Sequence, residues 1–383
     1  MLAIWGTDAL SLKMYARLSE EDRKRAFLVG PNVRQDWNAD GLHTPHYIIE
    51  PRRLPFENVT KLLILSSAYS RGSLHEKAVY WSILKNTPIR DDRIWVMDYP
   101  TFDRELSDHG SLDAFLASNT IPYLFHIEFE VSHHCNLNCK GCTHFTPLSE
   151  KKFGDFEGFV KDLARIRQMV DHIGHIQLLG GEPLLNPDLK RYVEAARDIY
   201  PHSEINVVTN GLLLGSVDDA LKETMRHTGA VFRVTLYPPI KNDVRTVIAQ
   251  MEQAGISCTV GYDTELFYAL LDPDGRSDPS LSNAMCTQSL CHIFENGRLN
   301  QCVMAHKIRV FEEYFQTGRV FPDCDLDLYA EGLTPFILQE YLMRPIEMCR
   351  FCGEPRPFPW ALAGKAPSKE DWYCDELPGK KTF

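Results

Sequence analysis

The sequence lacks several features that mark specialised classes of protein. It has no basic excess: 41 Lys and Arg residues stand against 52 Asp and Glu residues, which gives a formal net charge of −11. An acidic chain without a basic block fits phosphate backbones poorly, so nucleic-acid binding is excluded as the main activity. No apolar stretch approaches the ~18 residues of a membrane span, and no basic region precedes the short apolar run at the N-terminus. We therefore expect a cytoplasmic protein without a membrane or nucleic-acid partner.

Cysteine is too sparse for a small disulfide scaffold, since the 383 residues include only 11 of them. It is nevertheless more frequent than packing alone requires. In a reducing compartment these side chains should be thiols or metal thiolates, so their spacing decides what they do. The hydrophobic fraction of 44% and the charged fraction of 24% are typical of a globular protein.

Short β-rich runs alternate with amphipathic helical runs from residue 126 to about residue 262. We expect five strands, at His126–Val131, His175–Leu179, Ile205–Thr209, Val231–Tyr237 and Ser257–Tyr262. This alternation predicts parallel strands joined by crossover helices, either as an open doubly wound sheet or as a full or partial barrel. Residues that carry chemistry should then gather at the C-terminal ends of the strands.

Residues 1–120 show a second, weaker alternation that predicts a small Rossmann-like domain. Strands are expected at Leu2–Trp5, Ala26–Val29, Tyr47–Ile49, Lys61–Leu65 and Ile94–Met97, and a helix near Leu74–Leu84. The first turn, Gly6-Thr7-Asp8-Ala9, does not match a dinucleotide fingerprint, and Asp8 would repel a phosphate. A docking or oligomerisation platform is therefore favoured over a nucleotide site.

Cys135, Cys139 and Cys142 follow the first barrel strand with the spacing CxxxCxxC. Such a loop can bind three irons of a cubane iron–sulfur cluster and leave the fourth iron open to an exogenous ligand. Structural zinc is the competing interpretation, because thiolates suit both metals. Its fourth ligand would come from His133, His134 or His144.

A second motif, Gly180-Gly181-Glu182-Pro183, follows the next strand. Two glycines allow a ligand to approach the backbone closely, and the Glu182 carboxylate can accept from a ligand ammonium group. The alternative is a simple turn with a proline that begins a helix.

Together the two motifs resemble those of the radical S-adenosylmethionine (radical SAM) superfamily. The resemblance implies that the three cysteines bind a [4Fe-4S] cluster whose open iron holds S-adenosylmethionine. Reduction then yields a 5′-deoxyadenosyl radical that abstracts a substrate hydrogen, with a flavodoxin- or ferredoxin-type protein as electron donor. The cofactor-binding residues implied are Gly180, Gly181, Glu182 and Pro183 for the methionyl amine, and Thr209, Asn210, Thr235 and Tyr237 for the ribose and carboxylate. The position before the third cysteine is often aromatic in this family but is Gly141 here, which leaves Phe145 as a candidate for the missing ring.

The C-terminal cysteines resemble those of the auxiliary-cluster domains called SPASM and, in the shorter form, twitch. An expected hairpin at residues 292–301, with an Asn296-Gly297 turn, lies between Cys291 and Cys302. The resemblance implies a second [4Fe-4S] cluster, and the candidate ligands are Cys286, Cys291, Cys302, Cys349 and Cys352. Cys286 and Cys291 compete for one position, and a zinc ribbon is the alternative for the whole set.

The predicted architecture is thus α/β, with a partial (β/α)6 radical SAM barrel at residues 121–275. The Rossmann-like domain at residues 1–120 precedes it and a twitch-like cluster domain at residues 276–383 follows it. The resemblance favours oxidation or epimerisation of a small, polar, sugar-like metabolite, because a second cluster can accept an electron from a substrate radical. The alternatives are maturation of a ribosomally made peptide, sulfur insertion from the auxiliary cluster, and a non-enzymatic zinc protein. No residue is assigned a catalytic role from the sequence.

Overall fold

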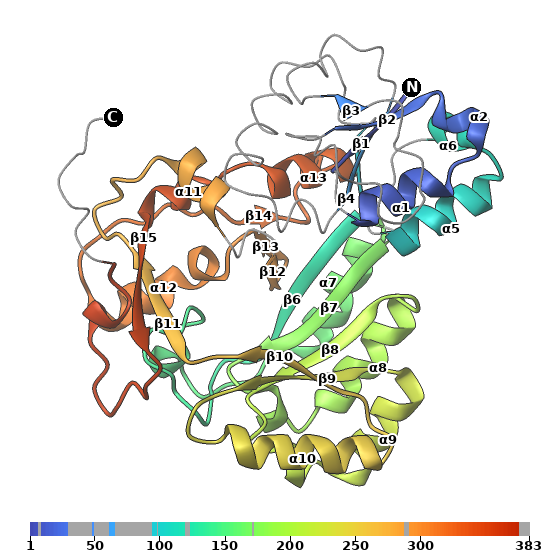
Figure 1. Cartoon of the computed structure of the whole chain (residues 1–383). Helices are drawn as coiled ribbons and strands as arrows, with labels where there is room; N and C mark the ends of the chain where they lie inside the picture. The colour runs from blue at the N-terminus through green and yellow to red at the C-terminus, as the bar shows by residue number, and fades with distance from the viewer. Residues whose placement is uncertain are drawn as a thin grey trace.

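The N-terminal part of the computed structural model is a parallel sheet flanked by helices (Figure 1). The structure describes residues 1–6, 9–29, 48–49, 61–65, 94–97, 99–118, 123–170, 172–286 and 291–374. The elements of this part are β1 (Leu2–Trp5), α1 (Ala9–Arg17), α2 (Glu20–Arg23), β2 (Ala26–Val29), β3 (Ile48–Ile49), β4 (Lys61–Leu65), β5 (Ile94–Met97), α5 (Tyr99–His109) and α6 (Leu112–Ala117). The strand order β3-β2-β1-β4-β5 is that of a Rossmann-like sheet, as predicted. The helix expected near Leu74–Leu84 lies outside the described residues.

Five parallel strands form the central barrel sheet, as the alternation predicts. They are β6 (Tyr123–Ser132), β7 (His172–Gly180), β8 (Glu204–Thr209), β9 (Val231–Leu236) and β10 (Cys258–Asp263). Each pairs in parallel with the next, and β12 adds a sixth parallel neighbour beside β6. The partial α/β barrel is therefore confirmed, although its sixth strand comes from the C-terminal part of the chain.

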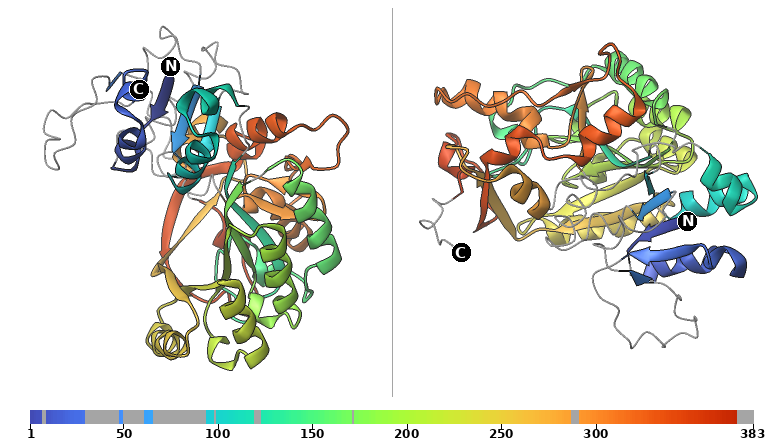
Figure 2. Two further views of the ribbon diagram at one scale, coloured as in Figure 1. Left: turned by 90° about the vertical axis from the view of Figure 1, so that its right-hand side faces the viewer. Right: turned by 90° about the horizontal axis from the view of Figure 1, so that it is seen from above.

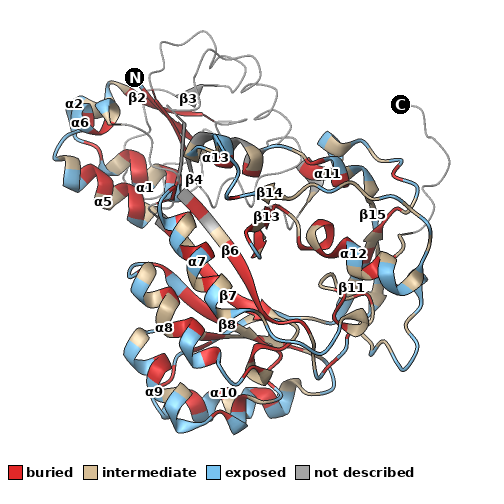
Figure 3. Ribbon diagram, turned by 180° about the vertical axis from the view of Figure 1, so that it is seen from behind, coloured by how far each residue is buried: buried red, intermediate tan, exposed pale blue. Residues whose placement is uncertain are grey.

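Crossover helices cover the outer face of this sheet (Figure 1). They are α7 (Phe156–Arg167), α8 (Leu189–Ile199), α9 (Asp219–Thr228) and α10 (Lys241–Gln253). Asp155 caps α7 by accepting from the Glu157 backbone N–H, and Asp218 caps α9 in the same way through Leu221. The apolar stripe of each helix packs on the strands, so that buried residues line the sheet and exposed residues lie on the outer helix faces (Figure 3).

The C-terminal part faces the concave side of the barrel. Its elements are β11 (Leu266–Leu271), α11 (Pro279–Met285), β12 (Ile293–Glu295), β13 (Arg298–Asn300), α12 (Val303–Phe315), β14 (Leu326–Asp327), α13 (Pro335–Met343) and β15 (Cys352–Pro359). Short 3-10 helices occur at Thr146–Leu148, Pro183–Leu185, Leu214–Ser216, Glu347–Phe351 and Lys369–Asp371. The predicted hairpin is confirmed, because β12 pairs antiparallel with β13 and both Asn296 and Gly297 have positive φ. β11 pairs with β15 in a separate sheet.

The N-terminal sheet lies beyond the start of β6, whereas the cysteine loop follows the end of β6 (Figures 1 and 2). An apolar core, separate from those of the barrel and the N-terminal sheet, joins the barrel to the C-terminal part around Phe145, Phe311 and Trp372. This core holds the C-terminal part against the loop that carries the first three cysteines. Within the described ranges, no helix is both long and apolar enough to cross a membrane.

Candidate active site

A cavity of about 690 Å³ lies at the C-terminal ends of the barrel strands. This is the end of a parallel α/β sheet at which ligands bind. Nine of the sequence-predicted site residues line it: Cys135, Cys139, Cys142, Gly180, Gly181, Thr209, Asn210, Thr235 and Tyr237. Glu182 and Pro183 are predicted site residues that do not line it. The fold therefore brings the first cysteine motif and the strand-end residues to one space.

The sulfur atoms of the first cysteine motif accept hydrogen bonds from neighbouring side chains. Cys135 accepts from Asn210 Nδ2 at 3.6 Å, Cys139 from Trp360 Nε1 at 3.1 Å and Cys142 from Thr146 Oγ1 at 3.6 Å. Burial raises the pKa of all three thiols, and the negative charge of Cys142 raises that of Cys139 further. Three thiolates can exist together here only with a cation beside them. The donor set therefore fits a thiolate-bound metal cluster.

The two glycines of the Gly180-Gly181-Glu182-Pro183 turn let it lie against the cysteine loop. Gly181 N donates to Ser132 O at 2.7 Å, and Glu182 N donates to His134 O at 2.9 Å. A Cβ atom on Gly181 would lie 2.0 Å from His134 O, and one on Gly180 would lie 2.1 Å from Ser132 O. Both glycines are therefore required for the close packing of the two backbones. The sequence alone suggests a different reason for them, the close approach of a ligand.

Glu182 ties the same turn to the loop after β8. Its carboxylate accepts from Thr209 Oγ1 at 2.7 Å, from Asn210 N at 2.9 Å and from Leu184 N at 3.0 Å. The side chain is fully buried. These contacts give Glu182 a positioning role, whereas the sequence predicts a direct contact between its carboxylate and a ligand ammonium. Pro183 begins the short 3-10 helix that follows.

Asn210 and Tyr237, two further predicted residues, also line the cavity. Asn210 Nδ2 also donates to Asn136 Oδ1 at 2.8 Å, so it links the β8 loop to the cysteine loop. The Tyr237 ring lies 5.5 Å from the Trp360 ring and 6.2 Å from the Phe267 ring. Burial and the nearby cysteine thiolates raise the pKa of Tyr237 well above its ordinary value, so its hydroxyl stays protonated and can donate.

Comparison with known families agrees with this geometry. Residues 129–238 match the model of the Radical SAM superfamily, and this range contains the three cysteines and the glycine turn. The chain carries a radical SAM domain. The matched range begins within β6 and ends just after β9.

Two curated proteins with different names are similar to part of this chain. A GTP 3′,8-cyclase of Nautilia profundicola is 30% identical over 99 residues, which are 26% of this chain and 31% of that protein. A 7,8-dihydro-6-hydroxymethylpterin dimethyltransferase of Methanocaldococcus jannaschii is 24% identical over 172 residues, which are 44% of this chain and 33% of that protein. The chain thus spans about a third of the length of the curated relatives it matches.

Two solved structures are similar to part of this chain. BtrN in complex with AdoMet and 2-DOIA has 17% identity and a TM-score of 0.38, with 60% of this chain and 93% of that chain covered. Streptococcus suis SuiB bound to precursor peptide SuiA has 13% identity and a TM-score of 0.30, with 47% and 37% covered.

An aromatic ring does lie beside Gly141 of the radical SAM domain, but it is not Phe145. Phe145 is fully buried against Phe311 and Trp372 and does not line the cavity. A Cβ atom on Gly141 would lie 2.7 Å from Cζ of Phe358, so this ring from β15 occupies the adjacent space. Sequence reasoning missed Phe358 and also Trp360, which donates to Cys139. Their proline-flanked run, Pro357-Phe358-Pro359-Trp360, is the only signal in the sequence.

Four C-terminal cysteines, with Cys291, Cys324 and Cys374 beside them, lie close enough together for their charges to interact. Burial and the charges of Cys286 and Cys349 together raise the pKa of Cys302 to about 12. Burial likewise raises the pKa of Cys352, with contributions from the other three thiolates of this set. The set is Cys286, Cys302, Cys349 and Cys352. As at the first cysteine motif, thiolates in this arrangement require a bound cation, which fits an auxiliary cluster.

A buried charge network lies between the cavity and the C-terminal part. Lys307 Nζ lies 2.5 Å from Glu130 Oε2 and 2.8 Å from Glu295 Oε2. Glu130 in turn pairs with His144, which lines the cavity, at 2.9 Å. Burial alone would lower the pKa of Lys307, but the two carboxylates raise it, so the ammonium stays charged.

The buried position of Glu182 predicts a pH effect on stability. Burial raises the pKa of its carboxyl from 4.5 to about 7 in the cofactor-free protein. A raised pKa contributes stability that is fully present below the unfolded pKa and is lost as pH rises through the folded pKa. Relative to Glu182→Gln, which stays neutral, the free energy of unfolding of the unaltered protein should fall by about 2.5 kcal/mol between pH 5 and pH 8. Denaturant unfolding of both cofactor-free proteins measures this, and parallel pH curves would contradict it.

Proposed function

We propose that this protein reductively cleaves S-adenosylmethionine and abstracts a hydrogen atom from a small, polar, sugar-like metabolite, which it oxidises or epimerises. Cys135, Cys139 and Cys142 would hold the [4Fe-4S] cluster of the radical SAM domain. Cys286, Cys302, Cys349 and Cys352 would hold a second [4Fe-4S] cluster. When bound, the first cluster and S-adenosylmethionine supply reductive homolysis, and the second cluster supplies an electron acceptor. A flavodoxin- or ferredoxin-type protein would supply the electron.

One observation carries this proposal: the three cysteines and the glycine turn meet at one cavity, with hydrogen-bond donors on all three sulfurs. The backbone bonds from Gly181 and Glu182 to the cysteine loop fix the turn beside the cluster ligands. Glu182 then fixes Thr209 and Asn210 against the same turn. A cofactor bound at the cluster would therefore contact three loops that are already joined to one another.

The size and lining of the cavity favour a small substrate over a peptide. Its volume of about 690 Å³ would have to hold S-adenosylmethionine as well as the substrate, which leaves room for a small molecule. Hydroxyl and imidazole groups of Thr143, His144, Thr264 and Tyr268 line it, and these can bind a substrate that carries several hydroxyl groups. Leu179 and Val208 line the cavity. Gln177 and Asn206 lie two residues earlier on the same strands, so their buried side chains are on the same face of the sheet, deeper in the barrel.

The test is the stoichiometry of the reaction with a panel of sugars and aminocyclitols that carry deuterium on carbon. For an oxidation we expect one 5′-deoxyadenosine per substrate molecule oxidised, with deuterium transferred into the 5′-deoxyadenosine. Epimerisation would also consume S-adenosylmethionine but would give a product of unchanged mass apart from the isotope. Turnover of only a ribosomally made peptide, or catalytic recycling of S-adenosylmethionine, would contradict the proposal.

Cys352→Ala separates the two proposed clusters. Because the auxiliary cluster would lose one of four ligands, we expect iron to fall from about eight to about four atoms per chain. Cleavage of S-adenosylmethionine should continue, whereas substrate oxidation should fall at least tenfold for lack of an electron acceptor. Iron analysis and product chromatography measure the two effects. Unchanged oxidation in Cys352→Ala would remove the auxiliary cluster from the reaction.

A further inference from the structure

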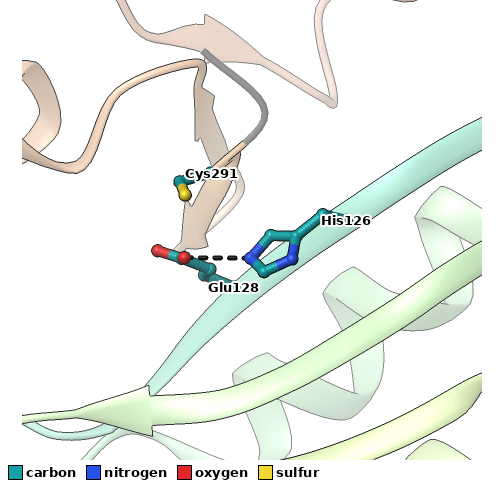
Figure 4. A group of neighbouring side chains, drawn as sticks. All are labelled: His126, Glu128 and Cys291. Carbon is teal, nitrogen blue, oxygen red and sulfur yellow. Dashed lines mark hydrogen bonds and ion pairs between the residues drawn. The ribbon is translucent and has the colours of Figure 1, made fainter. Parts of the chain in front are cut away.

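Three side chains with metal-binding atoms meet where β6 adjoins the segment before β12 (Figure 4). His126 and Glu128 extend from the same face of β6, and the Cys291 sulfur points toward the Glu128 carboxylate. One ligand atom from each lies within 4.8 Å of the other two, and His126 Nε2 lies 2.9 Å from Glu128 Oε1. Neither the cavity nor the set of four C-terminal cysteines uses these residues.

Among the described residues, the only basic side chain that pairs with Glu128 is the His126 imidazole. Glu128 is only 6% exposed, and its Oε2 atom has no hydrogen-bond partner among the described residues. The Cys291 sulfur points toward this carboxylate, and burial and the negative charge of Glu128 raise the pKa of the Cys291 thiol, so without a metal ion the thiol stays protonated beside the carboxylate. Within the described part of the chain, no Lys or Arg side chain forms an ion pair with Glu128.

A neighbouring group of possible metal ligands has its carboxylate charges balanced by a lysine. Glu130, His133 and Glu295 also place one ligand atom each within 4.8 Å of one another. There Lys307 lies 2.5 Å from Glu130 and 2.8 Å from Glu295, so the lysine ammonium takes the position that a metal ion would otherwise fill. Glu128 lies two residues before Glu130 on β6, and its group also offers three possible metal ligands but has no lysine ammonium beside them.

We propose that His126, Glu128 and Cys291 bind one divalent transition-metal ion of the zinc type. A thiolate, an imidazole and a carboxylate together favour Zn²⁺ over Mg²⁺ or Ca²⁺, which prefer oxygen ligands alone. The +2 charge of the ion neutralises the carboxylate and the thiolate, and binding releases the thiol proton to solvent. Three protein ligands leave the fourth tetrahedral position for water.

This site would hold two parts of the molecule together. β12 pairs with β6 through only two residue pairs, Ile293 with Glu128 and Phe294 with Phe129. A metal ion bound to β6 and to Cys291 would reinforce this short junction beside the auxiliary cysteines. The proposal also assigns Cys291 to a mononuclear site, so that Cys286 is left as the auxiliary-cluster ligand.

The test counts zinc and iron in the same protein. The anaerobically reconstituted holoprotein is equilibrated with Zn²⁺, desalted and analysed for both metals. We expect about one zinc and about eight irons per chain, with the iron set by two cubanes. Glu128→Gln and Cys291→Ser should each lower the zinc at least fivefold while iron stays at about eight. Glu204→Gln is the matched control, because Glu204 pairs with His175 at 3.3 Å on the neighbouring strands, and it should keep its zinc.

X-ray absorption spectroscopy at the zinc edge, applied to the unaltered holoprotein, tests the ligand set without any substitution. We expect one sulfur at about 2.3 Å and nitrogen or oxygen ligands at about 2.0–2.1 Å. A shell of four sulfurs would place the zinc in a cluster site and overturn the proposal. Loss of four irons in Cys291→Ser would also overturn it, by making Cys291 a cluster ligand. Since iron and zinc are counted separately, failure of this site is distinguishable from failure of the proposed radical chemistry.

Discussion

Replacing Cys142 with alanine is expected to lower the iron content from about eight to about four atoms per chain and to abolish S-adenosylmethionine cleavage. Cys142 lies in the cysteine loop, lines the cavity and accepts from Thr146. With two ligands left, the loop cannot retain a cubane cluster, whereas the four auxiliary cysteines are untouched. Iron analysis and chromatography of 5′-deoxyadenosine after reduction with dithionite measure both effects.

The matched control is Cys258→Ala. Cys258 is also a buried thiol of the barrel, on β10, and lies outside both proposed cluster sites. This variant should keep about eight irons and near-normal cleavage. If Cys142→Ala retained cleavage at more than a hundredth of the unaltered rate, the cysteine loop would not be the site of the reaction.

Replacing Lys307 with methionine is expected to destabilise the protein by about 3–5 kcal/mol, because it removes one partner of a buried ion pair. The Lys307 ammonium is the cation between Glu130 and Glu295, and the residue is 7% exposed. Methionine fills much of the same volume and leaves Glu130 and Glu295 with imidazole partners, from His133, His144 and His306, in place of the ammonium. The free energy of unfolding from denaturant titration at pH 7 measures the effect.

Arg226→Met provides the comparison for Lys307→Met. Arg226 pairs with Glu223 at 3.1 Å on the exposed face of α9, and loss of such a surface pair costs about 0–1 kcal/mol. A loss below about 1 kcal/mol in Lys307→Met would show that the network is not held together by this ammonium. Because Glu130 also contacts His144 at the cavity, we expect Lys307→Met to weaken substrate binding as well.

Local signals in the sequence were sufficient for the barrel and the first cysteine loop. The β-rich runs predict each of β6–β10 to within a few residues, because buried parallel strands and their capped helices leave strong patterns. The hairpin at Asn296-Gly297 was equally predictable, because that dipeptide favours two residues with positive φ. Cys135, Cys139 and Cys142 lie in one loop after one strand, so their spacing could be recognised from the sequence alone.

Features that depend on distant segments were not predictable. Trp360 contacts Cys139 across 221 residues, and Phe358 fills the space beside Gly141 only because β15 pairs with β11. The role of Glu182 depends on Thr209 and Asn210 in the next loop, which the motif itself does not reveal. Cys286 and Cys291 are five residues apart and both lie near Cys302, and the sequence does not reveal that Cys291 also faces Glu128 on β6.

The central claim is that this chain assembles two iron–sulfur clusters and uses one of them on S-adenosylmethionine. The most direct measurement is anaerobic purification and reconstitution, with iron counted per chain and 5′-deoxyadenosine measured after reduction in the presence of S-adenosylmethionine. We expect a brown protein with about eight irons that releases 5′-deoxyadenosine. A colourless protein that binds zinc without iron and releases no 5′-deoxyadenosine would contradict it.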